Sequence, residues 1–201
     1  MSMRWIVVDG IDGSGKNTHA RMIKTYYEEM GEKVSLVIHP SDRVWGRLSR
    51  QALRNTGRLM QFLASAFFLL DVLSTLRRRD VWEAHDTVIT VRYLMATAYL
   101  PGGLAKIGYD FFHRLLPVPN RLLLVDTKPR LAMERIALRN HEREMFETLP
   151  KLEEMRLKML SMAKEEWQVL DNSETPIGSN ERLLRILHEW DSDLGEERGP
   201  H

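Results

Sequence analysis

A glycine-rich segment near the start of the chain has the residue types and the spacing that bind phosphate. In VVDGIDGSGKNTHA, residues 7–20, the pattern G-x-x-x-x-G-K-[ST] is met by Gly10, Gly15 and Lys16, whereas Asn17 stands where a hydroxyl residue is expected. Glycines let a backbone turn tightly around an anion, and a lysine at a helix start adds a mobile charge beside unpaired amides. The segment therefore predicts a nucleotide-phosphate site, and a glycine-rich turn with an incidental lysine is the alternative.

The residue after the lysine determines how a metal ion would be held. The usual hydroxyl is a compact oxygen ligand for Mg²⁺, and the amide of Asn17 is one atom longer. We expect its carbonyl oxygen to hold magnesium, directly or through water.

Five short apolar runs are expected to form the sheet that positions this loop. They are rich in Val, Ile and Leu with little alternation, which is typical of strands buried on both faces, and helical segments separate them. This order predicts an α/β fold with a five-stranded parallel sheet. The runs are 4–10, 34–40, 87–93, 121–127 and 167–173, and the helical segments include 16–30, 58–79, 128–139, 146–166 and 180–190.

Polar side chains follow the predicted strands, at the end of a parallel sheet where ligands bind. An arginine directly after a buried strand, as Arg92 is, favours a functional over a structural role. The side chains at these ends include Asp9, His39, Arg92, Asp126, Asp171 and Asn172.

The composition indicates one globular domain with no overall charge that would attract nucleic acid or a membrane. The 201 residues include 29 basic and 28 acidic side chains, and the absence of cysteine excludes disulfides and thiolate metal sites. The longest apolar stretch, 62–70, has about half the length that a membrane crossing needs. We expect a cytoplasmic protein without a signal peptide, with one domain at 1–194 and a disordered tail at 195–201.

Several segments together resemble the thymidylate kinases. The loop is similar to that family's E-G-x-D-G-x-G-K-[ST]-T, and further similar segments follow in the family's order over nearly the whole chain. They are WGRLSRQAL (45–53), FFLLDVL (67–73), VRYLMATAYLPGG (91–103), LLLVDTKPRLAMERIALRN (122–140) and VLDNSETPIGSNERL (169–183). The resemblance implies a three-layer P-loop NTPase-type fold with a helical lid at about 138–150. It also implies transfer of the terminal phosphate of ATP to a nucleoside monophosphate with magnesium, and a homodimer through the apolar helix that contains residues 62–73.

The resemblance assigns roles to single residues. Lys16 would hold the donor phosphates, Arg92 would bind the acceptor phosphate, and Asp12 would accept a hydrogen bond from the sugar 3′-hydroxyl. Phe68 matches the aromatic residue that stacks on the pyrimidine, and Tyr99 lies near the tyrosine that senses a missing 2′-hydroxyl. A packing role in the core or at a dimer contact is the alternative for Phe68.

Gly13 places the chain among family members that lack an arginine in the loop and carry arginines in the lid. Arg139 and Arg143 would then close over the transferring phosphoryl group, and a solvated charged helix face is the alternative. The predicted ATP-binding set is Gly10, Asp12, Gly13, Ser14, Gly15, Lys16, Asn17, Thr18 and Asn172. The predicted acceptor set is Asp12, His39, Arg43, Phe68, Arg92 and Tyr99.

Departures from the family pattern fall at the acceptor and metal sites. Val91 replaces the aspartate of D-R-Y, Val72 replaces an arginine that would clamp the acceptor, and the segment after Arg92 is one residue short. His39 occupies an aromatic or acidic position before a proline, and Arg43 is expected to supply a displaced phosphate contact. Asp9 and Asn17 are the predicted metal ligands.

These departures leave two further functions open. The first is a phosphotransferase that acts on a different acceptor. The second is a nucleotide-binding regulatory protein whose catalysis has decayed.

Overall fold

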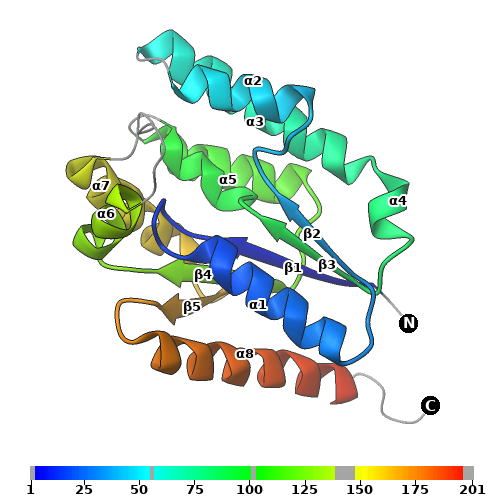
Figure 1. Ribbon diagram of the computed structural model, residues 1–201. Helices are drawn as coiled ribbons and strands as arrows, with labels where there is room; N and C mark the ends of the chain where they lie inside the picture. The colour runs from blue at the N-terminus through cyan, green and yellow to red at the C-terminus, as the bar shows by residue number, and fades with distance from the viewer. Residues whose placement is uncertain (1–2, 55–56, 101–102, 139–147, 197–201) are drawn as a thin grey trace.

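The computed structural model describes residues 3–54, 57–100, 103–138 and 148–196, and it places a five-stranded sheet between layers of helices (Figure 1). The strands lie in the order β2-β3-β1-β4-β5, and every adjacent pair is parallel. The α/β prediction is therefore confirmed. The strands are β1 (Arg4–Asp9), β2 (Val34–Ile38), β3 (Thr87–Val91), β4 (Arg121–Asp126) and β5 (Trp167–Asp171).

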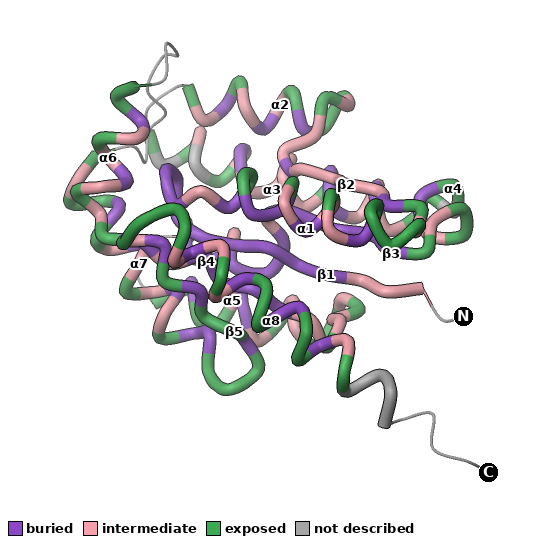
Figure 2. The backbone as a smooth tube through the Cα atoms, turned by 60° about the horizontal axis from the view of Figure 1, so that its bottom comes forward, coloured by how far each residue is buried: buried purple, intermediate pink, exposed green. Residues whose placement is uncertain are grey.

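Helices cover both faces of the sheet. Neighbouring side chains of β1 point to opposite faces, so that Ile6 and Val8 belong to the core under α1 (Lys16–Glu29) and α8 (Pro176–Glu196). Val7 belongs to the other core, which is covered by the helices at 58–76, 104–115 and 149–163. The tube of β1 is accordingly mostly buried in Figure 2. The remaining helices are α2 (Val44–Leu53), α3 (Arg58–Leu76), α4 (Arg79–Trp82), the 3₁₀ helix η1 (Leu94–Tyr99), α5 (Leu104–Leu115), α6 (Pro129–Ala137) and α7 (Leu149–Ala163).

The register of the three strands on one side of the sheet brings three loops together. Val91 at the end of β3 is aligned with Val8 of β1 and with Ile38 of β2. The phosphate loop, the segment that begins at His39 and the segment that begins at Arg92 therefore leave the sheet at the same edge. The polar side chains that follow the strands were predicted from the sequence to lie at this edge.

The helices differ in part from the sequence predictions. Helices α2 and α5 are not predicted; on α5, Ile107 and Phe111 are exposed while Tyr109 is buried, so apolar residues on both faces obscure the helical period. Helix α8 runs through Glu196 and thus includes the first two residues of the expected disordered tail. Most of the expected lid, 139–147, lies outside the described residues. Among the described residues, no helix is both long and apolar enough to cross a membrane.

The edge strands also differ from the expectation that all five strands are buried on both faces. Val169 of β5 is 46% exposed, whereas every residue of β3 is buried. The helical layers cover the middle of the sheet more completely than its edges.

Candidate active site

The phosphate loop between β1 and α1 has a backbone that only glycine adopts readily. Gly13 and Gly15 have φ angles of 77° and 92°, in the left-handed region. A Cβ atom at Gly13 would lie 2.4 Å from the carbonyl oxygen of Ala132 in α6, so a side chain has no room there. The loop is therefore built for close packing on one side and an exposed helix start on the other.

Side chains from two distant elements and from the adjoining helix α1 brace this loop. Asn172, after β5, donates a hydrogen bond from Nδ2 to the carbonyl oxygen of Ser14, at 2.7 Å. Arg135 of α6 donates to the same oxygen at 3.3 Å, and His19 of α1 contacts the carbonyl oxygen of Gly15 at 3.0 Å. Asn172, predicted to bind ATP, thus holds the loop itself in this structure.

Asp12 is the centre of a cluster that joins the loop to β3 and η1. Its carboxylate lies 3.2 Å from Nζ of Lys16, accepts a short hydrogen bond from Arg92, and accepts one from the hydroxyl of Tyr99 at 3.0 Å. Lys16 also donates to the carbonyl oxygen of Ile11 at 3.0 Å. Asp12 is only 4% exposed. The structure therefore brings together four residues that the sequence predicts for donor and acceptor binding.

Burial and mutual charge set the protonation of this cluster. Burial opposes ionisation of Asp12, yet the charges of Arg92 and Lys16 outweigh it and hold the pKa of that carboxyl well below its ordinary value. Burial, aided by the charge of Arg92, lowers the pKa of Lys16 to about 8. Burial and the negative Asp12 raise the pKa of Tyr99 well above its ordinary value. Lys16 and Arg92 thus share the carboxylate of Asp12, and the buried carboxyl of Asp9 also interacts with both of their charges.

A cavity of about 300 Å³ opens beside the cluster. Asp12, Arg92 and Tyr99 line one part of it, and Phe68 of α3 lines another. Most of the remaining lining is apolar and includes Leu53, Phe62, Leu69, Val72, Phe112 and Leu116. Its size and its few polar groups are those of a small-molecule site.

Two predicted acceptor residues lie outside the lining of this cavity. His39 is buried, with Nδ1 3.1 Å from the carbonyl oxygen of Arg92 and Nε2 2.9 Å from the hydroxyl of Thr75. Arg43 forms an ion pair with the buried Asp71 at 3.1 Å. Both side chains are occupied by protein groups, so a direct contact with an acceptor would require rearrangement.

The predicted metal ligands differ in how well they suit magnesium. Asp9 is 1% exposed, and its carboxylate accepts hydrogen bonds from the backbone amides of Tyr93 and Met95 at 2.9 and 3.2 Å. Burial raises its pKa to about 6. An inward, amide-bonded carboxylate of this kind fits a structural role better than a metal-binding one. Asn17 is exposed in the first turn of α1.

Other predicted residues are placed as follows. Thr18 is exposed beside Asn17 at the start of α1, and Ser14 is buried within the loop. Arg139 and Arg143 lie outside the described residues.

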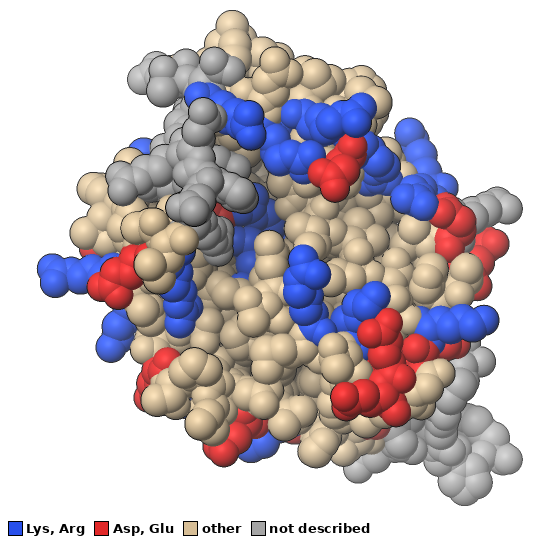
Figure 3. Space-filling view, viewed as in Figure 1, with Lys and Arg blue, Asp and Glu red and all other residues tan. Residues whose placement is uncertain are grey.

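On the described surface, lysine and arginine side chains gather over α2 on the face seen in Figure 3. Any attraction for anions is therefore local, as the net charge of +1 suggests.

Three residues with structural contacts around the site, Arg135, His19 and Asp71, have no role predicted from the sequence. Arg135 lies in the segment VDTKPRLAMERI, whose resemblance to the family is among the most specific, and this was the available signal. His19 lies in the loop segment 7–20 and Asp71 in FFLLDVL (67–73), but their partners come from distant elements. Oγ of Ser179 in α8, for example, lies 2.8 Å from Nε2 of His19.

Comparisons with known proteins agree with this geometry. The family model described as Thymidylate kinase matches residues 8–182. A thymidylate kinase of Xanthomonas campestris pv. campestris is 33% identical over 193 residues, which cover 91% of this chain and 80% of the relative. A putative thymidylate kinase of Aeropyrum pernix is 32% identical over 158 residues, which cover 77% and 76%.

Solved structures show the same fold. The thymidylate kinase of Candida albicans superposes with a TM-score of 0.67 at 18% identity, over 95% of this chain and 93% of that chain. The thymidylate kinase of Ehrlichia chaffeensis superposes with a TM-score of 0.67 at 18% identity, over 94% and 100%.

Proposed function

This chain belongs to the thymidylate kinase family, and from that premise we propose that it transfers the terminal phosphate of ATP to dTMP, giving ADP and dTDP. The observation that carries the proposal is the cluster around Asp12, which links the phosphate loop to the apolar cavity. A donor phosphate on the loop and an acceptor in the cavity would meet at this cluster. Phosphoryl transfer requires such alignment and charge stabilisation more than covalent chemistry.

Substrate binding exchanges partners within the cluster. Lys16 leaves Asp12 and the loop carbonyl for the donor phosphates, and Arg92 leaves Asp12 for the acceptor phosphate. Asp12 is then free to accept a hydrogen bond from the sugar 3′-hydroxyl, with Tyr99 still in contact. Phe68, on the cavity wall, supplies a face for the pyrimidine.

Magnesium fits this site through one described residue. Bound magnesium would neutralise charge on the donor phosphates, and it keeps most of its ligands as phosphate oxygens and water. The exposed amide of Asn17 would hold it, whereas Val91 is buried and apolar and offers no ligand. Arg139 and Arg143 complete the proposal as lid residues that add positive charge on closure.

We further propose that the protein forms a homodimer through α3, where Leu59 and Phe62 are 66% and 69% exposed. It works in the cytoplasm, in keeping with a chain that has no cysteine.

The test is ADP release from ATP in the presence of dTMP. Wild-type protein is expected to turn over, and Lys16→Ala is expected to abolish turnover. Protein that binds ATP but phosphorylates no pyrimidine monophosphate would contradict the proposal.

A second candidate, transfer to another acceptor, is favoured by Val72 on the cavity wall, where the family pattern has an arginine. A panel of nucleosides and monophosphates in the same assay separates the two. A decayed kinase is recognised by Asn17→Thr with Val91→Asp, which would raise its turnover.

A further inference from the structure

The backbone of Arg92 is held in a conformation that arginine rarely adopts. Its φ angle is 62°, in the left-handed region. Its amide donates to the carbonyl oxygen of Val8 at 3.1 Å, and the next amide, of Tyr93, donates to Asp9 at 2.9 Å. Its own carbonyl oxygen lies 3.1 Å from Nδ1 of His39. Of these three contacts, only the last comes from outside the two central strands and their ends.

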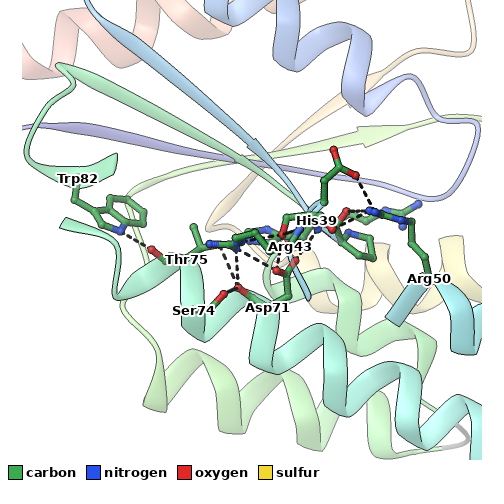
Figure 4. A network of polar contacts seen from close by, with 11 residues as sticks. His39, Arg43, Arg50, Asp71, Ser74, Thr75 and Trp82 are labelled. Atoms are coloured by element: carbon green, nitrogen blue, oxygen red, sulfur yellow. Dashed lines mark hydrogen bonds and ion pairs between the residues drawn. The ribbon is translucent and has the colours of Figure 1, made fainter. Parts of the chain in front are cut away.

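A network anchored on α3 fixes His39 (Figure 4). Nε2 of His39 lies 2.9 Å from the hydroxyl oxygen of Thr75, which accepts a short hydrogen bond from Arg43. Arg43 also donates to the carboxylate of Asp71 at 3.1 Å. That fully buried carboxylate accepts hydrogen bonds from the amide and hydroxyl of Ser41, at 2.7 and 2.6 Å.

The chemistry of these groups gives the network a direction. Burial lowers the pKa of His39 to about 4, although the charge of Asp71 opposes the shift, so the ring is neutral at neutral pH. A neutral imidazole carries one N–H, and a carbonyl oxygen can only accept, so Nδ1 must donate to Arg92. Nε2 then accepts from the hydroxyl of Thr75, for whose proton it is the nearer acceptor, at 2.9 Å against 3.1 Å for the carbonyl oxygen of Asp71. The oxygen of that hydroxyl accepts from Arg43. Every donor in this chain points toward Arg92.

We propose that the chain Arg43–Thr75–His39 positions the guanidinium of Arg92 for the acceptor phosphate, which makes His39 and Thr75 positioning residues. The inference rests on the proposed function. A purely structural role, in which the network only fastens the segment after β2 to α3, predicts a loss of stability with no preference between the two substrates.

Thr75→Val separates these roles because it removes the hydroxyl and keeps the shape. We expect KM for dTMP to rise on the order of tenfold, since the hydroxyl that links Arg43 to His39 is lost and a catalytic group shifts, while KM for ATP stays unchanged. Thr75→Ser should restore the wild-type value. Thr87→Val is the matched control, because that buried hydroxyl bonds Glu32 at the opposite end of β3. Equal changes in both KM values, or none, would overturn the inference.

A measurement independent of turnover distinguishes failure of this inference from failure of the proposed function. ¹⁵N NMR of the imidazole should show the Nδ1–H tautomer of His39 between pH 6 and 8. The Nε signal of Arg92 should shift in Thr75→Val and stay in place in Thr87→Val. An Nε2–H tautomer, or an unmoved Arg92 signal, would refute the chain even in an active kinase. The predicted spectra in a protein that does not phosphorylate dTMP would refute only the function.

Discussion

Replacing Asp12 by asparagine tests whether its carboxylate stabilises the charges of Lys16 and Arg92 until phosphate binds to them. The variant keeps the shape and removes the Asp12 carboxylate, which contacts both Lys16 and Arg92. Two cations then share a buried site without their closest counter-charge. We expect the variant to be less stable than wild type in the absence of ligand, and to regain much of the difference when phosphate-bearing ligands bind.

The magnitude follows from burial. Removing one partner of a buried ion pair costs about 3–5 kcal/mol. The side chain of Arg92 is 19% exposed and can turn toward water, which places the expected loss near the lower limit, about 3 kcal/mol. For a chain of this size that corresponds to a fall in Tm of roughly 6–12 °C. The loss holds above the ordinary pKa of an aspartate and disappears at lower pH, where wild-type Asp12 is itself protonated.

Thermal unfolding with and without ATP or dTMP is the assay. Asp126→Asn is the control: it removes the carboxylate that pairs with Arg156 at 2.7 Å, an ion pair in which neither Lys16 nor Arg92 takes part. Both variants should lose stability, but only Asp12→Asn should show a larger ligand-induced rise in Tm than wild type. An equal rise in Tm in all three proteins would refute the claim that Asp12 stabilises these two charges in the absence of phosphate.

Two further predictions concern binding and assembly. Because Lys16 has a pKa of about 8 and phosphate favours its charged form, the Kd for ATP should rise by up to about tenfold per pH unit above pH 8. Calorimetry should show this slope in the wild-type protein and a flatter slope in Lys16→Arg. A wild-type Kd that stays constant up to about pH 9.5 would contradict the prediction. Phe62→Arg should convert the proposed dimer to monomer in sedimentation, whereas Ile107→Arg, on the exposed face of α5, should leave it intact.

The sheet and the phosphate loop can be predicted from the sequence because both have local sequence signals. Continuous apolar runs predict all five strands to within a few residues, and glycine spacing locates the phosphate loop. The segments that extend beyond the actual strands, at His39 and Arg92, are those where the backbone leaves the sheet to form the site. Local patterns therefore predict which residues gather at this edge.

Local patterns do not predict which groups these residues contact. Arg43 was expected at an acceptor phosphate, but its partners Asp71 and Thr75 lie 28 and 32 residues further along, on a helix whose packing no local period reveals. Asp9 was expected to bind a metal ion, and in the structure its carboxylate accepts hydrogen bonds from backbone amides 84 and 86 residues further along the chain. Such pairings depend on strand register and helix packing, which emerge only from the whole fold.

The most direct test of the central claim is ³¹P NMR of ATP and dTMP mixed with the wild-type protein and magnesium. The account predicts that dTDP and ADP form in equal amounts, and that Lys16→Ala forms neither. ATP that binds while dTMP stays unchanged, or ATP that is cleaved to ADP and inorganic phosphate without dTDP, would contradict it.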